Sequence, residues 1–245
     1  MSIESLFSRL ALAETHKDLF RNVVSLHESQ NLFDDLSSNP DEWRLAEQAE
    51  ADARPLPYRS HQPEIDRPFE DSLWYNAIRW PFRNWQASRF SDGSFGVWYG
   101  SDRIDTTVYE TVYHWYRGLL CDAGFEQERV VIERRLFRVA CDALLLDFRS
   151  AADAWPAMLH PEDYAFTQLV GARVHREGHP GILTRSVRHH GGLNYAIMNP
   201  HVLSNPRYHS YLRYQLGAGS VRVEGSSGSD LSMAVDLNSF RVSGG

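Results

Sequence analysis

The stretch SRFSDGSFGVWYGSDRIDTTVYETVYH, residues 88–114, carries the strongest indications of how this chain folds. In it, an Arg-Phe pair is followed by a glycine-containing turn, an aromatic segment typical of a strand, and apolar residues at helical spacing. Arg89, Tyr99 and Glu110 thus lie on three successive elements, and His114 follows Glu110 by one turn on the same face of the predicted helix. A cation, an aromatic ring and a carboxylate can therefore meet at one small-molecule site.

The remainder of the chain predicts an α+β fold. Residues 1–70 repeat apolar side chains mostly at helical spacing, and Asn39-Pro40 has the composition of a helix start, so we expect an N-terminal helical extension there. Residues 71–245 combine strand-like and helix-like segments, which we expect to form one domain with helices flanking a sheet. The expected strands are 73–80, 95–100, 129–139, 143–148, 181–188 and 194–198, and the expected helices of this domain are 105–120 and 161–175.

The composition is that of a soluble protein with one sizeable core. The chain has 245 residues, of which 42% are hydrophobic, and a formal net charge of −7. This charge argues against direct nucleic-acid binding, which needs a basic stripe for phosphate contacts. The sequence has no secretory signal and no apolar run of membrane-spanning length. Cys121 and Cys141 lack metal-ligand or redox-motif spacing and resemble reduced core residues, so we expect a cytoplasmic protein without membrane contact.

The common catalytic and metal-binding motifs are absent from the sequence. It has no phosphate-binding P-loop, no His-Glu-x-x-His and no Gly-x-Ser-x-Gly. His175 and His179 have the spacing of helical metal ligands, but Gly178 and Pro180 make a helix there unfavourable. We therefore expect no metal site.

Pattern alone leaves the candidate site residues with two interpretations each. Arg83 and Arg89 follow a predicted strand and could hold a pyrophosphate, or they could be solvated surface arginines. Tyr99 could stack on a heteroaromatic ring or pack in the core. The helical pattern favours Glu110 at an exposed helix edge, and Ser186 alone is an ordinary strand serine.

Three segments taken together resemble the RES domain family, which is named for an arginine, a glutamate and a serine. They are SRFSDGSFGVWYGS (88–101), TTVYETVYH (106–114) and GILTRSVR followed by GGLNY (181–195). The resemblance extends over about residues 73–200, with the motifs in matching order and at compatible spacing. Members of that family are typically toxins of RES-Xre toxin-antitoxin pairs.

The resemblance implies a fold like that of the ADP-ribosyltransferases, a mixed sheet with a cleft for NAD. It maps the family's arginine to Arg89, its strand tyrosine to Tyr99, its glutamate to Glu110 and its serine to Ser186, and it turns Glu110 inward. The upstream arginine maps to Arg83 or to Arg59, and we prefer Arg83 because a predicted strand precedes it.

The implied activity is destruction of NAD, which would be the substrate and not a cofactor, by hydrolysis or phosphorolysis of the nicotinamide–ribose bond. Glu110 would stabilise an oxocarbenium-like ribose, Arg83 and Arg89 would hold the pyrophosphate, and Tyr99 would pack on the nicotinamide or its ribose. Ser186 would orient that ribose or Glu110 itself.

Two rival functions stay open at this point. One is transfer of ADP-ribose to a protein, which would use the same residues, and the other is a catalytically silent NAD-binding protein. The resemblance also implies an Xre-type antitoxin as partner. A homo-oligomer is compatible with the sequence, which does not set the oligomeric state.

Overall fold

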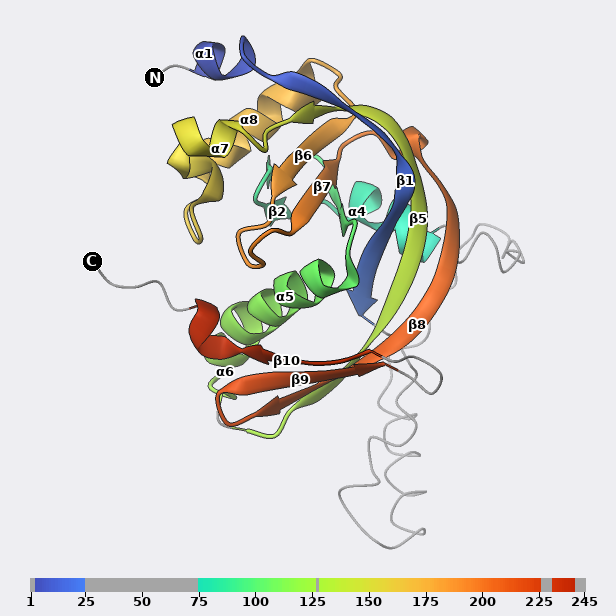
Figure 1. Cartoon of the computed structure of the whole chain (residues 1–245), viewed down its shortest axis with the longest axis vertical. Helices are drawn as coiled ribbons and strands as arrows, with labels where there is room; N and C mark the ends of the chain where they lie inside the picture. The colour runs from blue at the N-terminus through green and yellow to red at the C-terminus, as the bar shows by residue number, and fades with distance from the viewer. Residues whose placement is uncertain (1–2, 25–74, 127, 226–230, 241–245) are drawn as a thin grey trace, which may run out of the picture. The chain divides into compact units, whose positions relative to one another are not determined.

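The computed structural model describes residues 3–24, 75–126, 128–225 and 231–240 (Figure 1). The strands among these residues form one mixed eight-stranded sheet in the order β1-β4-β7-β6-β5-β8-β9-β10, and β5–β6 is the parallel pair among antiparallel ones. The strands are β1 (Ala11–Val24), β4 (Trp98–Ser101), β5 (Val131–Asp147), β6 (Gly181–Arg185), β7 (Leu193–Ile197), β8 (Leu203–Gly217), β9 (Ser220–Gly225) and β10 (Ser232–Asp236), with β2 (Ala87–Ser88) and β3 (Ser91–Asp92) as a separate hairpin.

Strand β1 closes part of this sheet into a ring. It pairs with β5 over its whole length, from Ala11↔Asp147 to Val24↔Arg134, and with β4 at Phe20↔Ser101. Strands β1, β4, β7, β6 and β5 therefore follow one another around a closed circuit. Buried side chains from all five strands fill this ring, among them Leu19, Trp98, Tyr195, Leu183 and Leu145.

Two longer helices and several short helical segments accompany this sheet. They are α1 (Ile3–Phe7), η1 (Tyr75–Arg79), α4 (Trp80–Arg83), α5 (Ile104–Trp115), η2 (Tyr116–Leu120), α6 (Cys121–Ala123), α7 (Ala151–Ala154), η3 (Pro156–Leu159), α8 (Ala165–Arg176), η4 (Pro200–Val202) and η5 (Leu237–Phe240). Helix α5 lies in the concave side of the long strands, with α7 and α8 above it in the view of Figure 1. Val108 and Val112 of α5 pack with buried residues of β8, β9 and β10, whereas Val170 and Val174 of α8 pack against Phe90 and its neighbours.

The expected α+β class, with a mixed sheet and flanking helices, is confirmed. Helix α5 occupies most of the predicted 105–120 segment, because its apolar positions face the sheet. The predicted strands 129–139 and 143–148 are parts of the single long strand β5, whose backbone continues through the polar residue between them. No helix in the described part of the chain has both the length and the apolar character needed to cross a membrane.

Two predicted elements are wrong. Residues 11–24 form β1 and not a helix, and they share the sheet with the rest of the domain, so the expected boundary at residue 70 does not separate them from it. Local spacing of Phe20, Val23 and Val24 suits a helix, but pairing with β5 overrides it. Segment 73–80 was expected as a strand, yet from Tyr75 it is helical, because Ala77 and Ile78 are buried together and Pro81 favours a helix start. The helix expected at 40–53 lies outside the described residues.

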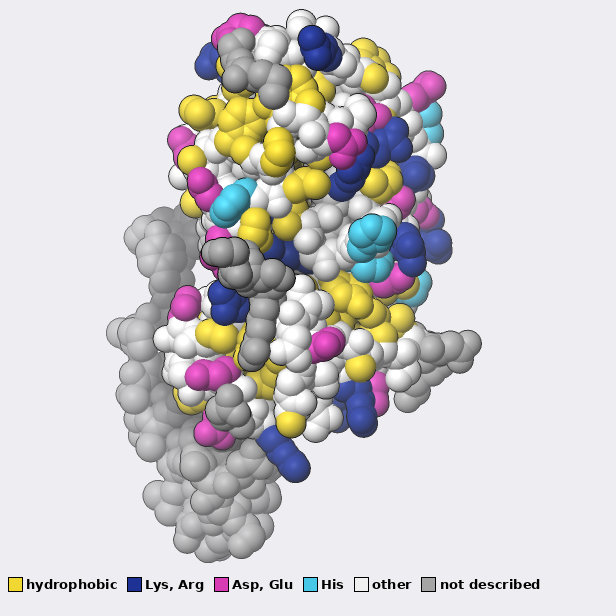
Figure 2. Space-filling view, turned by 60° about the vertical axis from the view of Figure 1, so that its left-hand side comes forward, with side chains coloured by type: hydrophobic (Ala, Val, Ile, Leu, Met, Phe, Trp, Pro, Cys, Tyr) yellow, Lys and Arg dark blue, Asp and Glu magenta, His cyan; other side chains and the backbone are white. Residues whose placement is uncertain are grey.

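Charged side chains are mixed on the surface that Figure 2 shows. Basic side chains stand there among acidic ones and do not form one continuous basic stripe.

Candidate active site

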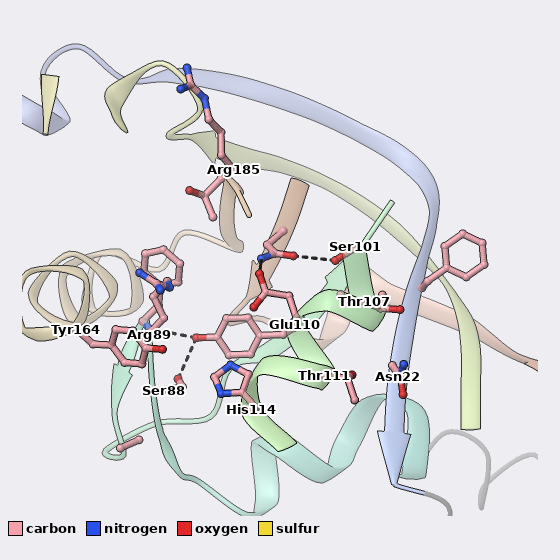
Figure 3. Close-up of a pocket in the computed structure, with 17 residues that line it drawn as sticks. Asn22, Ser88, Arg89, Ser101, Thr107, Glu110, Thr111, His114, Tyr164 and Arg185 are labelled. Carbon is pink, nitrogen blue, oxygen red and sulfur yellow. Dashed lines mark hydrogen bonds between the residues drawn. The ribbon is translucent and has the colours of Figure 1, made fainter. Parts of the chain in front are cut away.

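A cavity of about 400 Å³ is lined by residues of α5 from Thr107 to His114, by residues of β1, β4, β6 and β7, and by β2 with the segment that follows it (Figure 3). Its wall includes Arg89, Tyr99, Glu110 and His114. Three of the residues singled out from the sequence therefore meet at one cavity. The fourth, Ser186, lies behind Glu110 and touches it.

Glu110 is held in one orientation by two hydrogen bonds to the same oxygen. Its Oε1 accepts from the Ser186 hydroxyl at 2.7 Å and from Asn194 Nδ2 at 2.5 Å. Among the described residues no hydrogen bond reaches Oε2, so this oxygen is available to a ligand in the cavity. The inward orientation agrees with the family resemblance and not with the exposed helix edge that the pattern favoured.

The Ser186 hydroxyl makes three hydrogen bonds within the protein. Its Oγ accepts from the backbone N–H groups of Arg188 at 3.1 Å and His189 at 3.0 Å while it donates to Glu110. The turn that supplies these amides is closed by a bond from the Ser186 N–H to the Gly192 carbonyl, at 2.8 Å. The donor and both acceptor positions of the hydroxyl are thus used within the protein, and its donated bond holds Glu110.

Asn194 is a site residue that sequence reasoning missed. It lies directly opposite Ser101 in the β4–β7 pairing, and the Ser101 hydroxyl donates to Asn194 Oδ1 at 2.8 Å. This bond sets the amide so that its NH₂ faces Glu110. The only sequence signal was its position in the GGLNY segment, where an uncharged amide stood in a short strand.

Tyr99 offers its ring to the cavity while its hydroxyl holds the neighbouring segment. The hydroxyl accepts from the Phe90 N–H at 3.1 Å and lies 2.9 Å from Ser88 Oγ. Burial raises the pKa of Tyr99 to about 12, so the phenol is neutral near pH 7. The Tyr99 hydroxyl therefore supports the segment that carries Arg89, while Tyr99 also lines the cavity.

Arg89 places a guanidinium group at the cavity, and this group forms no ion pair with a described residue. Its Nη1 donates to the His160 carbonyl at 2.9 Å, and the guanidinium lies over the Tyr164 ring at 4.5 Å. No described carboxylate is within ion-pair distance of it. Burial lowers the pKa of Arg89, yet an arginine keeps its charge in proteins. A half-buried cation of this kind is stabilised best by an anionic ligand.

The upstream arginine is not brought to the cavity. Arg83 ends α4 with its side chain exposed, and it is not part of the cavity wall. The alternative, Arg59, lies outside the described residues. Of the two described arginines that line the cavity, Arg185 is paired with Asp153, so Arg89 is the candidate for binding a phosphate group there.

His114 follows Glu110 by one turn of α5 and borders the cavity (Figure 3). Removal of the imidazole from bulk water lowers its pKa from 6.5, although part of the side chain remains exposed. Near pH 7 this histidine is therefore neutral and can accept or donate a hydrogen bond through its two ring nitrogens. The sequence placed it on the same face as Glu110 but assigned it no role.

The lowered pKa of His114 predicts sensitivity to acid. Below about pH 6.5 the unfolded chain binds this proton more readily than the folded protein, so the free energy of unfolding falls as the pH drops. His114→Gln should therefore lose less stability between pH 7 and pH 5 than the wild type, as measured by urea denaturation. His201→Gln, at an exposed histidine away from the cavity, serves as the control. An identical pH dependence in wild type and His114→Gln would contradict the prediction.

Comparison with known proteins found a matching family model and similar solved structures. The model of the RES domain matches residues 56–217. No curated protein matches the chain. Among solved structures, a chain of the M. tuberculosis MbcT–MbcA toxin–antitoxin complex is similar over 86% of this chain and 90% of its own length, with 10% sequence identity and a TM-score of 0.46. Since the RES match spans well over half of the sequence and contains the three motifs that meet at the cavity, this chain belongs to the RES domain family.

Proposed function

We propose that this protein cleaves the bond between nicotinamide and ribose in NAD and acts as the toxin of a toxin–antitoxin pair. The observation that carries the proposal is the geometry of Glu110, whose Oε1 is fixed by Ser186 and Asn194 while Oε2 is left to the cavity. A carboxylate fixed in this way is suited to stabilise a positive charge that develops next to it. Its orientation costs nothing further when the reaction occurs.

The reaction requires this kind of group. When the bond to the nicotinamide nitrogen breaks, the electron pair leaves with nicotinamide, and positive charge develops on the ribose as an oxocarbenium-like centre. Glu110 Oε2 would interact with this sugar through its negative charge. The nucleophile, water or phosphate, then forms the new bond to the same carbon.

The charges of the cavity fit the rest of the substrate. NAD carries its negative charge on a pyrophosphate, and Arg89 supplies a half-buried guanidinium without a described carboxylate partner. Such a group binds phosphate oxygens by charge-assisted hydrogen bonds. The Tyr99 ring borders the same cavity and would pack on the nicotinamide or its ribose.

The test is incubation of the purified protein with NAD, followed by chromatography of the products. We expect free nicotinamide together with ADP-ribose in the absence of phosphate, or with a phosphorylated ADP-ribose when phosphate is present and is the acceptor. Radiolabel retained on a protein would instead favour transfer of ADP-ribose. No release of nicotinamide under any of these conditions would refute the proposed activity.

The proposed protein partner is inferred from the family to which the chain belongs. Members of the RES family are typically toxins paired with an Xre-type antitoxin, and we propose such a partner here, one that covers the cavity. Expression of the protein alone should arrest growth and lower cellular NAD, and co-expression of the antitoxin should restore both. Harmless expression of an active enzyme would contradict the toxin role.

Asn194→Leu is expected to lower the rate of nicotinamide release by about tenfold while the protein stays folded. Leucine has a similar size but cannot donate to Glu110 Oε1, so the carboxylate loses one of the two bonds that orient it. Steady-state kinetics should show the loss mainly in kcat. Asn238→Leu, at an exposed amide away from the cavity, is the control. Wild-type kcat in Asn194→Leu would show that the orientation of Glu110 does not depend on this bond.

A further inference from the structure

Thr184 on β6 has a buried hydroxyl group that lacks a partner. The residue is 2% exposed, it lines the cavity, and its Oγ1 makes no hydrogen bond to any described residue. A hydroxyl buried without a partner costs free energy, and nearly all such groups in folded proteins are paired. The exception at the cavity wall suggests that the partner comes from outside the chain.

The place of Thr184 in the sheet connects it to Glu110. In the strand pairing, Thr184 lies opposite Asn194, and Asn194 lies opposite Ser101. The three polar side chains thus form a row across β6, β7 and β4, on the side of the sheet that faces the cavity. Ser101 and Asn194 are joined by a hydrogen bond, and Asn194 continues it to Glu110. Thr184 ends this row without a bond of its own.

The guanidinium of the neighbouring Arg185 is not the missing partner of the Thr184 hydroxyl. Arg185, the next residue on β6, donates to both carboxylate oxygens of Asp153, at 2.8 and 3.0 Å. The guanidinium is therefore engaged with Asp153 rather than with Thr184. What Thr184 adds to the cavity is one neutral group that both donates and accepts hydrogen bonds.

We propose that Thr184 is a substrate-contact residue whose hydroxyl pairs with a hydroxyl group of the ribose attached to nicotinamide. The proposal rests on the proposed function, in which the same sugar lies against Glu110 Oε2, close to the row that Thr184 ends. A sugar hydroxyl can act as donor or acceptor to the Thr184 hydroxyl.

A substrate contact and a structural role predict opposite effects on stability. Thr184→Val replaces the hydroxyl by a methyl group of similar size. In the ligand-free protein no hydrogen bond is lost, so the thermal midpoint should stay the same or rise. With NAD bound, the missing partner should lower kcat/KM by about tenfold, the effect of one hydrogen bond. A structural hydroxyl would lower both quantities together.

The experiment compares wild type, Thr184→Val and Thr184→Ser for thermal midpoint without ligand and for kcat/KM with NAD. Thr184→Ser, which keeps the hydroxyl, should retain most of the activity. The matched control is Thr167→Val, because Thr167 is equally buried but its hydroxyl donates to the Tyr164 carbonyl at 3.0 Å. This control should lower the thermal midpoint.

A second substrate identifies the contacted group. The analogues are NAD molecules that each lack one hydroxyl of the nicotinamide ribose. The analogue without the contacted hydroxyl should react equally with wild type and Thr184→Val, because it cannot make the contact with either protein. If the wild type is active and Thr184→Val turns over NAD equally well, the proposed contact is refuted and the proposed function is not. A wild type that releases no nicotinamide overturns the proposed function and the contact with it. If Thr184→Val does not fold, the same comparison with Thr184→Ala decides.

Discussion

Glu110→Gln is expected to lower the rate of nicotinamide release by roughly a hundredfold to a thousandfold, the range found when one preorganised electrostatic group is removed from an active site. Glutamine has the same shape, and its carbonyl oxygen can still accept from Ser186 and Asn194. The change therefore removes the negative charge and leaves the packing of α5 intact. The loss should appear in kcat, since the charge acts on a cation that exists only as the bond breaks.

The measurement is nicotinamide release at saturating NAD, together with the thermal midpoint of each protein. Glu128→Gln is the matched control, because it makes the same chemical change at an exposed position away from the cavity. The control should keep wild-type activity. Nicotinamide release by Glu110→Gln at more than about half the wild-type rate would mean that the carboxylate is not the group that stabilises the transition state.

Gly171→Ala is expected to destabilise the protein by roughly 1–3 kcal/mol or to prevent folding, the effect of inserting atoms where there is no space. A Cβ atom at Gly171 would lie 1.9 Å from the Phe90 carbonyl oxygen and 2.7 Å from its carbon. These are backbone atoms, which cannot move aside by rotation of a side chain. Helix α8 and the segment after β2 would have to separate, and Arg89 lies in that segment. Nicotinamide release should therefore fall with stability.

Gly118→Ala provides the control for this substitution. Nothing lies within 4 Å of a Cβ built at Gly118, and the residue is in η2, so alanine there should be neutral or stabilise by up to about 1 kcal/mol. The free energy of unfolding of both variants is measured by urea denaturation. Equal stability of Gly171→Ala and wild type would show that the contact between α8 and Phe90 is not tight in solution.

Local sequence pattern was sufficient for the α+β class, and it singled out Arg89, Tyr99 and Glu110 as candidates without deciding between two interpretations of each. Helix α5 follows from apolar residues at helical spacing, and this spacing is a local property that tertiary contacts did not change. Arg89, Tyr99 and Glu110 were found because they belong to one continuous stretch. Ser186 was added through the family's order of motifs.

Contacts between distant segments of the folded chain determine that residues 11–24 form β1 and that Glu110 points inward. They also determine that Asn194 and Thr184 lie opposite each other near Glu110. The hydrogen bonds of β1 come from β5, more than a hundred residues later, so no local pattern in residues 11–24 could report them. Asn194 and Thr184 lie within the third segment of the family resemblance, but both are uncharged and neither is one of the three residues for which the family is named. Strand pairing sets them opposite each other in register, and Asn194 is in turn bonded to Glu110. Register depends on how separate strands meet in the folded protein, and it is therefore not readable from the order of residues along one strand.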